Sequence, residues 1–248
     1  MKKLVVYGSA YPDIVKLIDA INLVNPEWEL LGFIDDKKET QGKSVLGYPA
    51  LGDRSVIPDL VKDKNIYFFN SYVDGLSVFK ERINLLESYG CNIPTLIHPS
   101  VDMNHVKIGR GCLIAEGCVI GTKVEIGNFV STRIRSVICH DTRVEDYSFI
   151  GPGVTIGSCL TLKSGSFIGA GATILRTKNV GKDSVVGAGA VVVKDVPERT
   201  TVAGVPARKL RKNPIKRVIR RIRKEIKNLI YLQKSSVLKH KIMQNRSQ

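Results

Sequence analysis

The chain has 248 residues, of which 43% are hydrophobic, and a formal net charge of +15. This length accommodates one large domain or two modest ones. No stretch approaches the ~20 uninterrupted apolar residues of a membrane span, and the apolar segment after the first lysines is too short for a secretory signal. These features argue against an integral membrane protein and favour a cytoplasmic one.

The positive charge lies mainly in the C-terminal tail. From Arg208 to the end there are fifteen Lys and Arg residues and one acid, Glu225, whereas the other 207 residues carry 23 basic and 22 acidic groups. Apolar residues recur at helical spacing over residues 213–230, which predicts a basic amphipathic helix. Such a helix contacts the inner face of a membrane or packs on its own oligomer. We expect no nucleic-acid binding, because the rest of the chain has no matching basic patch.

The N-terminal part alternates strands and helices. We expect strands at Lys3–Tyr7, Glu29–Ile34, Asn65–Phe69 and Asn92–Ile97, a helix that opens at Pro12, a second helix at Leu76–Tyr89, and a polar loop from Lys37 to Gly52. Alternation of this kind predicts a small parallel sheet. We therefore expect an α/β, Rossmann-like domain over residues 1–95.

An internal repeat dominates the following segment. Every sixth residue from Ile108 to Val192 is a branched aliphatic one at fourteen of fifteen positions, and Thr132 is the exception. A period of six fits neither an α-helix nor a single strand, whose period is two. It does fit a unit that turns a corner after each short strand, with three units in one triangular coil. The repeat predicts a parallel β-helix of about five coils over residues 96–207.

Two further positions of the repeat are distinctive. Glycine often follows the aliphatic residue, as at Gly121 and Gly169, which suits a tight corner or a positive φ. The fourth residue after the aliphatic one is often small, as at Ser148 and Ala172.

The five cysteines (Cys91, Cys112, Cys118, Cys139 and Cys159) are odd in number and include no CxxC pair. This argues against a disulfide framework and against a zinc site, so we expect free thiols and no metal.

Four features in a fixed order point to a known family. They are the α/β segment, the sequence LIHPS, the hexads with the pair His140-Asp141, and a closing AGVPARKL. Together they resemble the hexapeptide-repeat sugar O- and N-acyltransferases, which include sialic-acid O-acetyltransferases and UDP-4-amino-sugar N-acetyltransferases. The resemblance covers about residues 3–212.

The resemblance implies a left-handed β-helix, a homotrimer and an enzyme of bacterial surface-polysaccharide synthesis. Such an enzyme transfers acetyl directly from acetyl-CoA to a sugar or nucleotide-linked amino sugar. The sequence specifies neither the acceptor sugar nor whether nitrogen or oxygen is acetylated, nor whether the donor is strictly acetyl.

The general base of this family is a histidine followed by an acid, which corresponds to His140 and Asp141. A thioester is already activated, so the enzyme must remove a proton from the acceptor and stabilise an oxyanion. The carboxylate would orient the imidazole ring. His140 is the only histidine of the repeat and lies two residues after Ile138, so its side chain should face outward. A solvated histidine without a catalytic role is the competing interpretation.

Relatives hold acetyl-CoA between neighbouring subunits. The matching positions here are Phe149, Gly169, Ala170, Gly187 and Ala188, and Arg208 and Lys209 are candidates for contacts with the CoA phosphates. Small residues suit the corners of a coil equally well, so this set has a purely structural alternative.

The N-terminal domain of relatives binds the nucleotide-sugar acceptor. The matching positions are Ala10, Tyr11, Asp35, Asp36 and Asn70. Carboxylates after a strand can accept hydrogen bonds from a ribose or a base, and a charged turn is the alternative.

The chain departs from the family pattern at three places. The glycine-rich loop is reduced to Gly8-Ser9-Ala10-Tyr11-Pro12, which weakens a turn that approaches phosphate. Phe149 replaces a second histidine near the acyl group, and Glu145 replaces a glycine. The first departure puts the nucleotide-sugar acceptor in question, whereas the second leaves the base in place.

Two other functions occur on such a fold. A zinc-dependent carbonic anhydrase needs three histidines around its metal, and the single histidine of the repeat does not supply them. A non-catalytic sugar-nucleotide-binding or scaffold protein remains the alternative to an acetyltransferase.

Overall fold

The structure, a computed structural model, describes residues 1–71 and 75–210. Residues 1–209 form one compact unit. The predicted basic helix over residues 213–230 lies outside the described residues. In the described part of the chain, no helix has both the length and the apolar character needed to cross a membrane.

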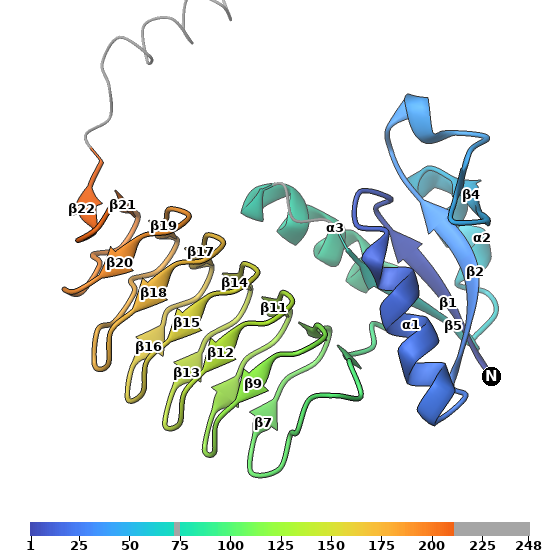
Figure 1. Ribbon diagram of the computed structural model, residues 1–248. Coiled ribbons are helices and arrows are strands. Elements are labelled where there is room, and N and C mark those ends of the chain that lie inside the picture. The colour runs from blue at the N-terminus through green and yellow to red at the C-terminus, as the bar shows by residue number, and fades with distance from the viewer. Residues whose placement is uncertain (72–74, 211–248) are drawn as a thin grey trace, which may run out of the picture. The chain divides into compact units, whose positions relative to one another are not determined.

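The N-terminal part is an α/β domain built on a five-stranded sheet (Figure 1). Its strands β1, β2, β4 and β5 are parallel in the order β4-β2-β1-β5, and β3 pairs antiparallel with β4 at the edge. The strands are β1 (Lys2–Tyr7), β2 (Trp28–Ile34), β3 (Ser44–Val45), β4 (Tyr48–Gly52) and β5 (Ile66–Asn70). The helices are α1 (Asp13–Val24), η1 (Lys38–Thr40), η2 (Arg54–Val56), α2 (Ile57–Leu60) and α3 (Leu76–Ser88).

The central strand β1 is apolar because it is buried on both faces. Leu4 and Val6 pack with residues of α1, whereas Val5 and Tyr7 pack in a second cluster with residues of α2 and α3. Such continuous apolar runs are typical of parallel sheets covered on both sides.

Most of the predicted N-terminal elements are present, and two predictions are wrong. The predicted loop from Lys37 to Gly52 contains the strands β3 and β4, which extend the sheet beside β2. The predicted strand Asn92–Ile97 is reduced to β6 (Leu96–Ile97), which pairs with β8 (Leu113–Ile114) and not with β5. Asn92 makes only an isolated bridge to Tyr67. Residues 96–97 therefore begin the β-helix instead of ending the sheet.

The repeat folds into stacked parallel strands that form three sheets, which we call faces 1, 2 and 3 (Figure 1). The chain visits the faces in this order in every coil, and five full coils are present, as predicted. Face 1 holds β7 (Lys107–Ile108), β10 (Glu125–Ile126), β13 (Arg143–Val144) and β16 (Thr161–Leu162). Face 2 holds β6, β8, β11 (Ser131–Thr132), β14 (Phe149–Ile150), β17 (Phe167–Ile168), β19 (Val185–Val186), β21 (Thr201–Ala203) and β22 (Arg208–Lys209). Face 3 holds β9 (Val119–Ile120), β12 (Val137–Ile138), β15 (Thr155–Ile156), β18 (Thr173–Ile174) and β20 (Val191–Val192).

One residue of each short strand points into the β-helix. Of the fifteen repeat positions, all are buried except Ile108 and Ile120, which are half-buried. The small residues predicted at the corners, such as Ser148 and Ala172, are also buried. The six-residue period therefore reflects one inward side chain per strand, and the stacked strands fit the predicted left-handed β-helix.

The glycines that follow the repeat positions are required for a reason other than the positive φ that the sequence suggested. Positive φ angles occur two residues further along, at Gly153 and Gly171 and also at Asp141 and Lys123. Gly121 is needed because a Cβ there would lie 2.6 Å from the backbone nitrogen of His140 in the next coil. Close stacking of coils, and not a left-handed backbone, excludes a side chain at this position.

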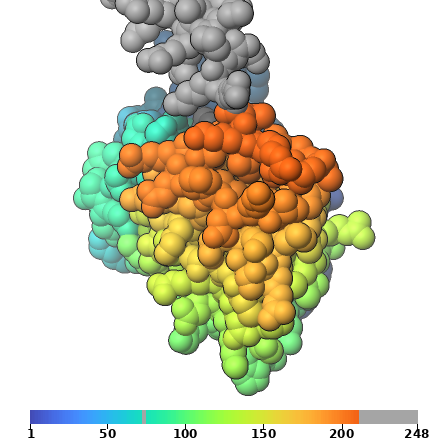
Figure 2. All heavy atoms as spheres, turned by 90° about the vertical axis from the view of Figure 1, so that its left-hand side faces the viewer, coloured from blue at the N-terminus to red at the C-terminus, as the bar shows by residue number. Residues whose placement is uncertain are grey.

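The N-terminal domain packs on face 2 through the start of α3. The rings of Phe79 and Tyr147 meet edge to face at 6.5 Å, and Tyr147 stacks on Phe129 at 5.3 Å. Figure 2 views the molecule from the end that carries the last coils, in orange, with the teal segment that includes α3 beside them. This packing brings residues of the N-terminal domain next to the strands of face 2.

Candidate active site

His140 and Asp141 lie at the corner between faces 3 and 1, directly after β12. Both side chains are exposed, His140 by 56% and Asp141 by 46%, so the predicted outward orientation of His140 is confirmed. Asp141 has a φ of 54°, a left-handed conformation that aspartate tolerates better than most residues. At this corner its Oδ2 lies 2.7 Å from Nδ1 of His140.

This pairing prepares the imidazole to accept a proton. A carboxylate at Nδ1 favours the tautomer with its proton on that nitrogen, which leaves Nε2 as the free base. The hydrogen bond from His140 is the main cause that lowers the pKa of Asp141, so Asp141 is a carboxylate at neutral pH. The two residues therefore have the geometry of a general base and its orienting acid.

Cys159 lies in the next coil, beside this pair. In the described part of the chain, His140, Asp141 and Cys159 form the one group of three side chains able to ligate a metal, with ligand atoms within 4.8 Å of one another. All three are exposed, and Nδ1 of His140 is already bonded to Asp141. A metal bound here would compete with the predicted base function of His140. All five cysteines are free, and Cys159 is the exposed one.

The residues predicted to contact CoA lie along face 2 and at its corner with face 3. Phe149 of β14 stacks on Phe167 of β17 with ring centroids 4.7 Å apart. Gly169-Ala170 and Gly187-Ala188 follow β17 and β19, and a Cβ on Gly169 would lie 2.6 Å from the nitrogen of Ala188. Arg208 and Lys209 form β22 at the end of face 2 and are exposed. The predicted set therefore shares one side of the β-helix.

Within one chain, the base and the predicted CoA contacts lie at different corners of the coil. His140 follows a face 3 strand, whereas Ala170 and Ala188 follow face 2 strands. Face 3 separates the two corners. The residues of each predicted group therefore lie close to one another, but within one chain His140 is not close to the predicted CoA contacts.

The residues predicted to bind the acceptor gather at one edge of the N-terminal sheet. Ala10 and Tyr11 follow β1, Asp35 and Asp36 follow β2, and Asn70 ends β5. Because these strands are neighbours and parallel, their carboxyl ends meet where ligands commonly bind in such sheets.

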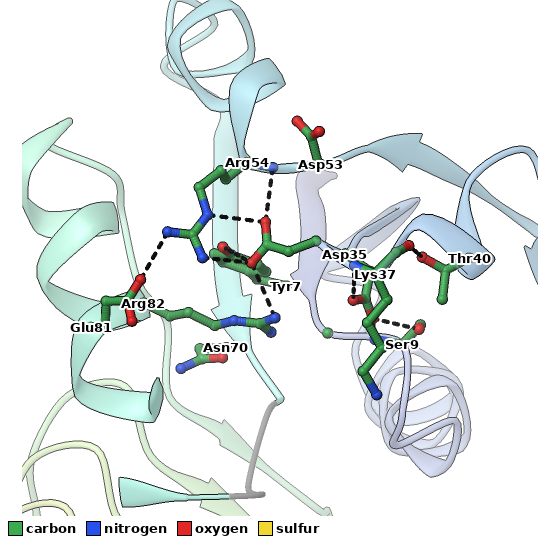
Figure 3. Close-up of polar contacts among 12 residues, drawn as sticks. Tyr7, Ser9, Asp35, Lys37, Thr40, Asp53, Arg54, Asn70, Glu81 and Arg82 are labelled. Atoms are coloured by element: carbon green, nitrogen blue, oxygen red, sulfur yellow. Dashed lines mark hydrogen bonds and ion pairs between the residues drawn. The ribbon is translucent and has the colours of Figure 1, made fainter. Parts of the chain in front are cut away.

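The two aspartates at this edge already have several partners inside the domain, and Figure 3 labels Asp35 together with Ser9 and Lys37. Asp35 accepts hydrogen bonds from the nitrogen and Oγ of Ser9 and from the nitrogen of Lys37. Burial alone would raise its pKa, but these hydrogen bonds outweigh it, and the net pKa is lowered.

Asp36 is the centre of a charged cluster. Its carboxylate accepts hydrogen bonds from Tyr7 at 2.7 Å, from Nε and Nη2 of Arg54 at 3.0 and 2.8 Å, and from Arg82 at 3.3 Å. Burial raises the pKa of this carboxyl, but the bonds from Arg54 and Tyr7 outweigh it and hold the pKa at about 2. The aspartates thus help to hold β1, β2, η2 and α3 together, and their role toward an acceptor stays a prediction.

A cavity of about 260 Å³ joins the N-terminal domain to face 2. It is lined by Ala10, Tyr11, Asp13, Ser71, Arg133, Ile134, Phe149 and Pro152. Two predicted acceptor residues, Ala10 and Tyr11, therefore share a cavity with Phe149 of the predicted CoA set. Arg133 also lines this cavity and was not among the predicted site residues. The one feature of the sequence that marks its position is Thr132, the preceding residue, which interrupts the aliphatic repeat.

The architecture is that of known sugar acetyltransferases. No protein-family model and no curated protein matches the chain. Three similar solved structures match over most of their length. The acetyltransferase domain of PglB from Neisseria gonorrhoeae, in complex with acetyl coenzyme A, is 27% identical, with a TM-score of 0.75 over 84% of this chain and 99% of that one. WeeI from Acinetobacter baumannii is 26% identical, with a TM-score of 0.72 over 84% and 99%.

A third structure adds an acceptor. It is a histidine-to-alanine mutant of GDP-perosamine N-acetyl transferase from Caulobacter crescentus in complex with CoA and GDP-perosamine, 24% identical, with a TM-score of 0.75 over 85% of this chain and 97% of that one. At this identity the likeness shows the fold alone. The PglB and WeeI structures, at 27% and 26% identity, bear out the resemblance to hexapeptide-repeat acyltransferases, and the third structure has the same fold.

Proposed function

We propose that the chain is an acetyltransferase that moves an acetyl group from acetyl-CoA to a nucleotide-linked amino sugar in bacterial surface-polysaccharide synthesis. The observation that carries the proposal is the exposed His140-Asp141 pair, 2.7 Å apart, on a β-helix similar to those of the PglB acetyltransferase domain and of GDP-perosamine N-acetyl transferase. The similar structures favour an amine over a hydroxyl as the acceptor group.

The pair supports a direct transfer. The acceptor nitrogen attacks the thioester carbonyl while Nε2 of His140 takes the proton that this nitrogen loses. Backbone N–H groups of the coil are the available donors for the resulting oxyanion. When the intermediate collapses, the C–S bond breaks and the imidazolium returns the proton to the CoA thiolate. Asp141 holds the ring and stabilises the imidazolium in between.

The domains would divide the work. We assign acceptor binding to a Rossmann-like domain of residues 1–95, through Ala10, Tyr11, Asp35, Asp36 and Asn70. Residues 96–207 would bind acetyl-CoA through Phe149, Gly169, Ala170, Gly187 and Ala188, with Arg208 and Lys209 near its phosphates. Residues 213–230 of the basic amphipathic tail (208–248) would contact the inner face of the membrane. Liposome sedimentation of the full chain and of a chain that ends at Lys212 tests this last assignment.

A homotrimer would complete the active site. The outward residues of face 3 are all β-branched (Val119, Val137, Thr155, Thr173 and Val191), and Val119 is 59% exposed. Face 1 instead presents the charged side chains of Lys107, Glu125 and Arg143. A second copy on face 3 would cover an apolar surface and would border both the His140 corner and the Ala170 corner.

A charge on face 3 tests the trimer. Val137→Arg should give a monomer in light scattering and should lose acetyl transfer, because burying an unpaired charge in the interface is costly. Thr161→Arg on face 1 is the matched control and should change neither property. A Val137→Arg protein that stays trimeric and active would contradict this interface.

Release of CoA thiol tests the proposed reaction. The full chain should release thiol from acetyl-CoA with UDP- or GDP-linked 4-amino sugars and much more slowly with the corresponding hydroxy sugars. Mass spectrometry of the product should show one added acetyl group. A folded protein that binds these nucleotide sugars but releases no thiol with any of them would favour the non-catalytic alternative.

A further inference from the structure

Arg133 is a buried cation at the corner between faces 2 and 3. Its exposed fraction is 5%, and its guanidinium stacks 3.7 Å above the ring of Tyr11 and lies 5.5 Å from the ring of Phe149. Its Nη1 has no hydrogen-bond partner in the structure. None of the ion pairs between described residues includes Arg133.

This arrangement is unfavourable for the protein alone. Burial lowers the pKa of Arg133, and only the Tyr11 side chain and the charge of Asp13 act in the opposite direction. Buried charges in proteins are normally paired, because their desolvation is expensive. Cation–π contacts with two rings recover part of this cost. Arg82 is about as buried as Arg133, but its guanidinium forms an ion pair with the carboxylate of Asp36.

The coil itself is irregular at this point. Thr132 occupies the inward position that is aliphatic at the other fourteen repeats, and its Oγ1 is buried without a hydrogen-bond partner. Arg133 occupies the next position, where eight other repeats have glycine. Thr132 and Arg133 are thus adjacent departures from the repeat, and each has a buried polar atom without a hydrogen-bond partner. Such departures lower stability and are typical of functional sites.

The cavity beside Arg133 has the chemistry of an anion subsite. Its volume of about 260 Å³ is smaller than that of a site for a whole drug-sized ligand, so it would take one part of an acceptor. Apart from Arg133 and Asp13, which is exposed, the lining consists of apolar and aromatic side chains and the hydroxyl group of Ser71, so the guanidinium is the one cationic group among the described residues that line the cavity. Arginine recognises carboxylates and phosphates through paired N–H groups.

We propose that Arg133 binds an oxyanion of the acceptor, a carboxylate or a phosphate, in the cavity formed with Ala10, Tyr11 and Phe149. The inference rests on the proposed function, since it names the chemical class of that acceptor. The loop of residues 8–12 has fewer glycines than in the resembled family and is less suited to contact an anion. In this proposal Arg133 of the β-helix makes that contact instead.

Equilibrium binding to the full chain, without turnover, tests the assignment. The probes are UDP and GDP, each compared with its nucleoside, and glucuronate compared with glucose. In the wild-type protein the anionic member of at least one pair should bind more tightly, and the pair that differs identifies phosphate or carboxylate as the source. Arg133→Met should weaken that anionic probe at least about ten-fold and leave its neutral partner unchanged.

Two controls separate this role from a structural one. Arg135→Gln removes an exposed arginine of the same corner and should leave probe binding unchanged. Arg133→Met should keep or raise the melting temperature, because it replaces an unpaired buried charge with an apolar side chain. A lower melting temperature with unchanged anion binding would overturn the proposal and make Arg133 structural.

The donor is distinguished in the same experiment. Acetyl-CoA should bind equally to the wild type and to Arg133→Met. If acetyl-CoA binding falls and acceptor probes are unaffected, the cavity serves the donor and the proposal fails. Binding is measured here without catalysis. If the protein transfers no acetyl group, only the proposed function is wrong. If anions bind equally well without Arg133, only this inference is wrong.

Discussion

Replacing His140 by alanine is expected to lower kcat for acetyl transfer by about 10²- to 10⁴-fold, the usual contribution of a general base. In the proposed mechanism the acceptor amine loses a proton as it attacks the thioester, and Nε2 of His140, whose ring is held by the hydrogen bond to Asp141, takes that proton. His140 is exposed and contributes little packing, so the variant should fold normally. Steady-state release of CoA thiol measures kcat, and equilibrium binding of acetyl-CoA should be unchanged.

His105→Asn is the matched control. His105 lies at another exposed corner, before the first full coil, and has a φ of 60°, which asparagine tolerates. This variant should retain full activity. If His140→Ala kept wild-type turnover, the proton would have to leave by another route and the proposed mechanism would be wrong.

Replacing Asp36 by alanine is expected to lower the free energy of unfolding by about 3 kcal/mol, as for the loss of one partner from a buried ion pair. The change removes the carboxylate that faces the buried Arg82 and that binds Tyr7 and Arg54. Urea denaturation measures the difference. Glu81→Gln, which removes the exposed second carboxylate partner of Arg54, should cost at most about 1 kcal/mol. Equal effects of the two changes would contradict a central role for Asp36.

The pH dependence gives the Asp36 cluster a second test. The pKa of Asp36 is about 2 in the folded protein and about 3.9 in an unfolded chain. As the pH falls below 4 the unfolded state takes up the proton first, so stability is lost between about pH 4 and pH 2. The contribution is about 2 to 3 kcal/mol at neutral pH. The difference in free energy of unfolding between the wild type and Asp36→Ala should therefore shrink as the pH falls from 4 to 2. A difference that stays constant over this interval would contradict the low pKa of Asp36.

The site was predictable where it depends on local sequence. A histidine two residues after an inward repeat position must stand at a corner of the coil, so the exposure of His140 followed from the spacing alone. Arg133 was missed because its character depends on its surroundings. Its burial comes from Tyr11, more than a hundred residues away in the chain, and only the break at Thr132 marked the position beforehand.

The sequence by itself determined the β-helix and the outward placement of His140, because a six-residue period repeats one local event, an inward side chain followed by a turn. It also determined most strands and helices of the N-terminal domain through apolar runs. The tertiary structure alone decided that Leu96–Ile97 joins face 2, that Gly121 is required by the coil above it, and that Asp36 is engaged by two arginines. These features depend on contacts between segments distant in the chain, for which a periodic pattern carries no information.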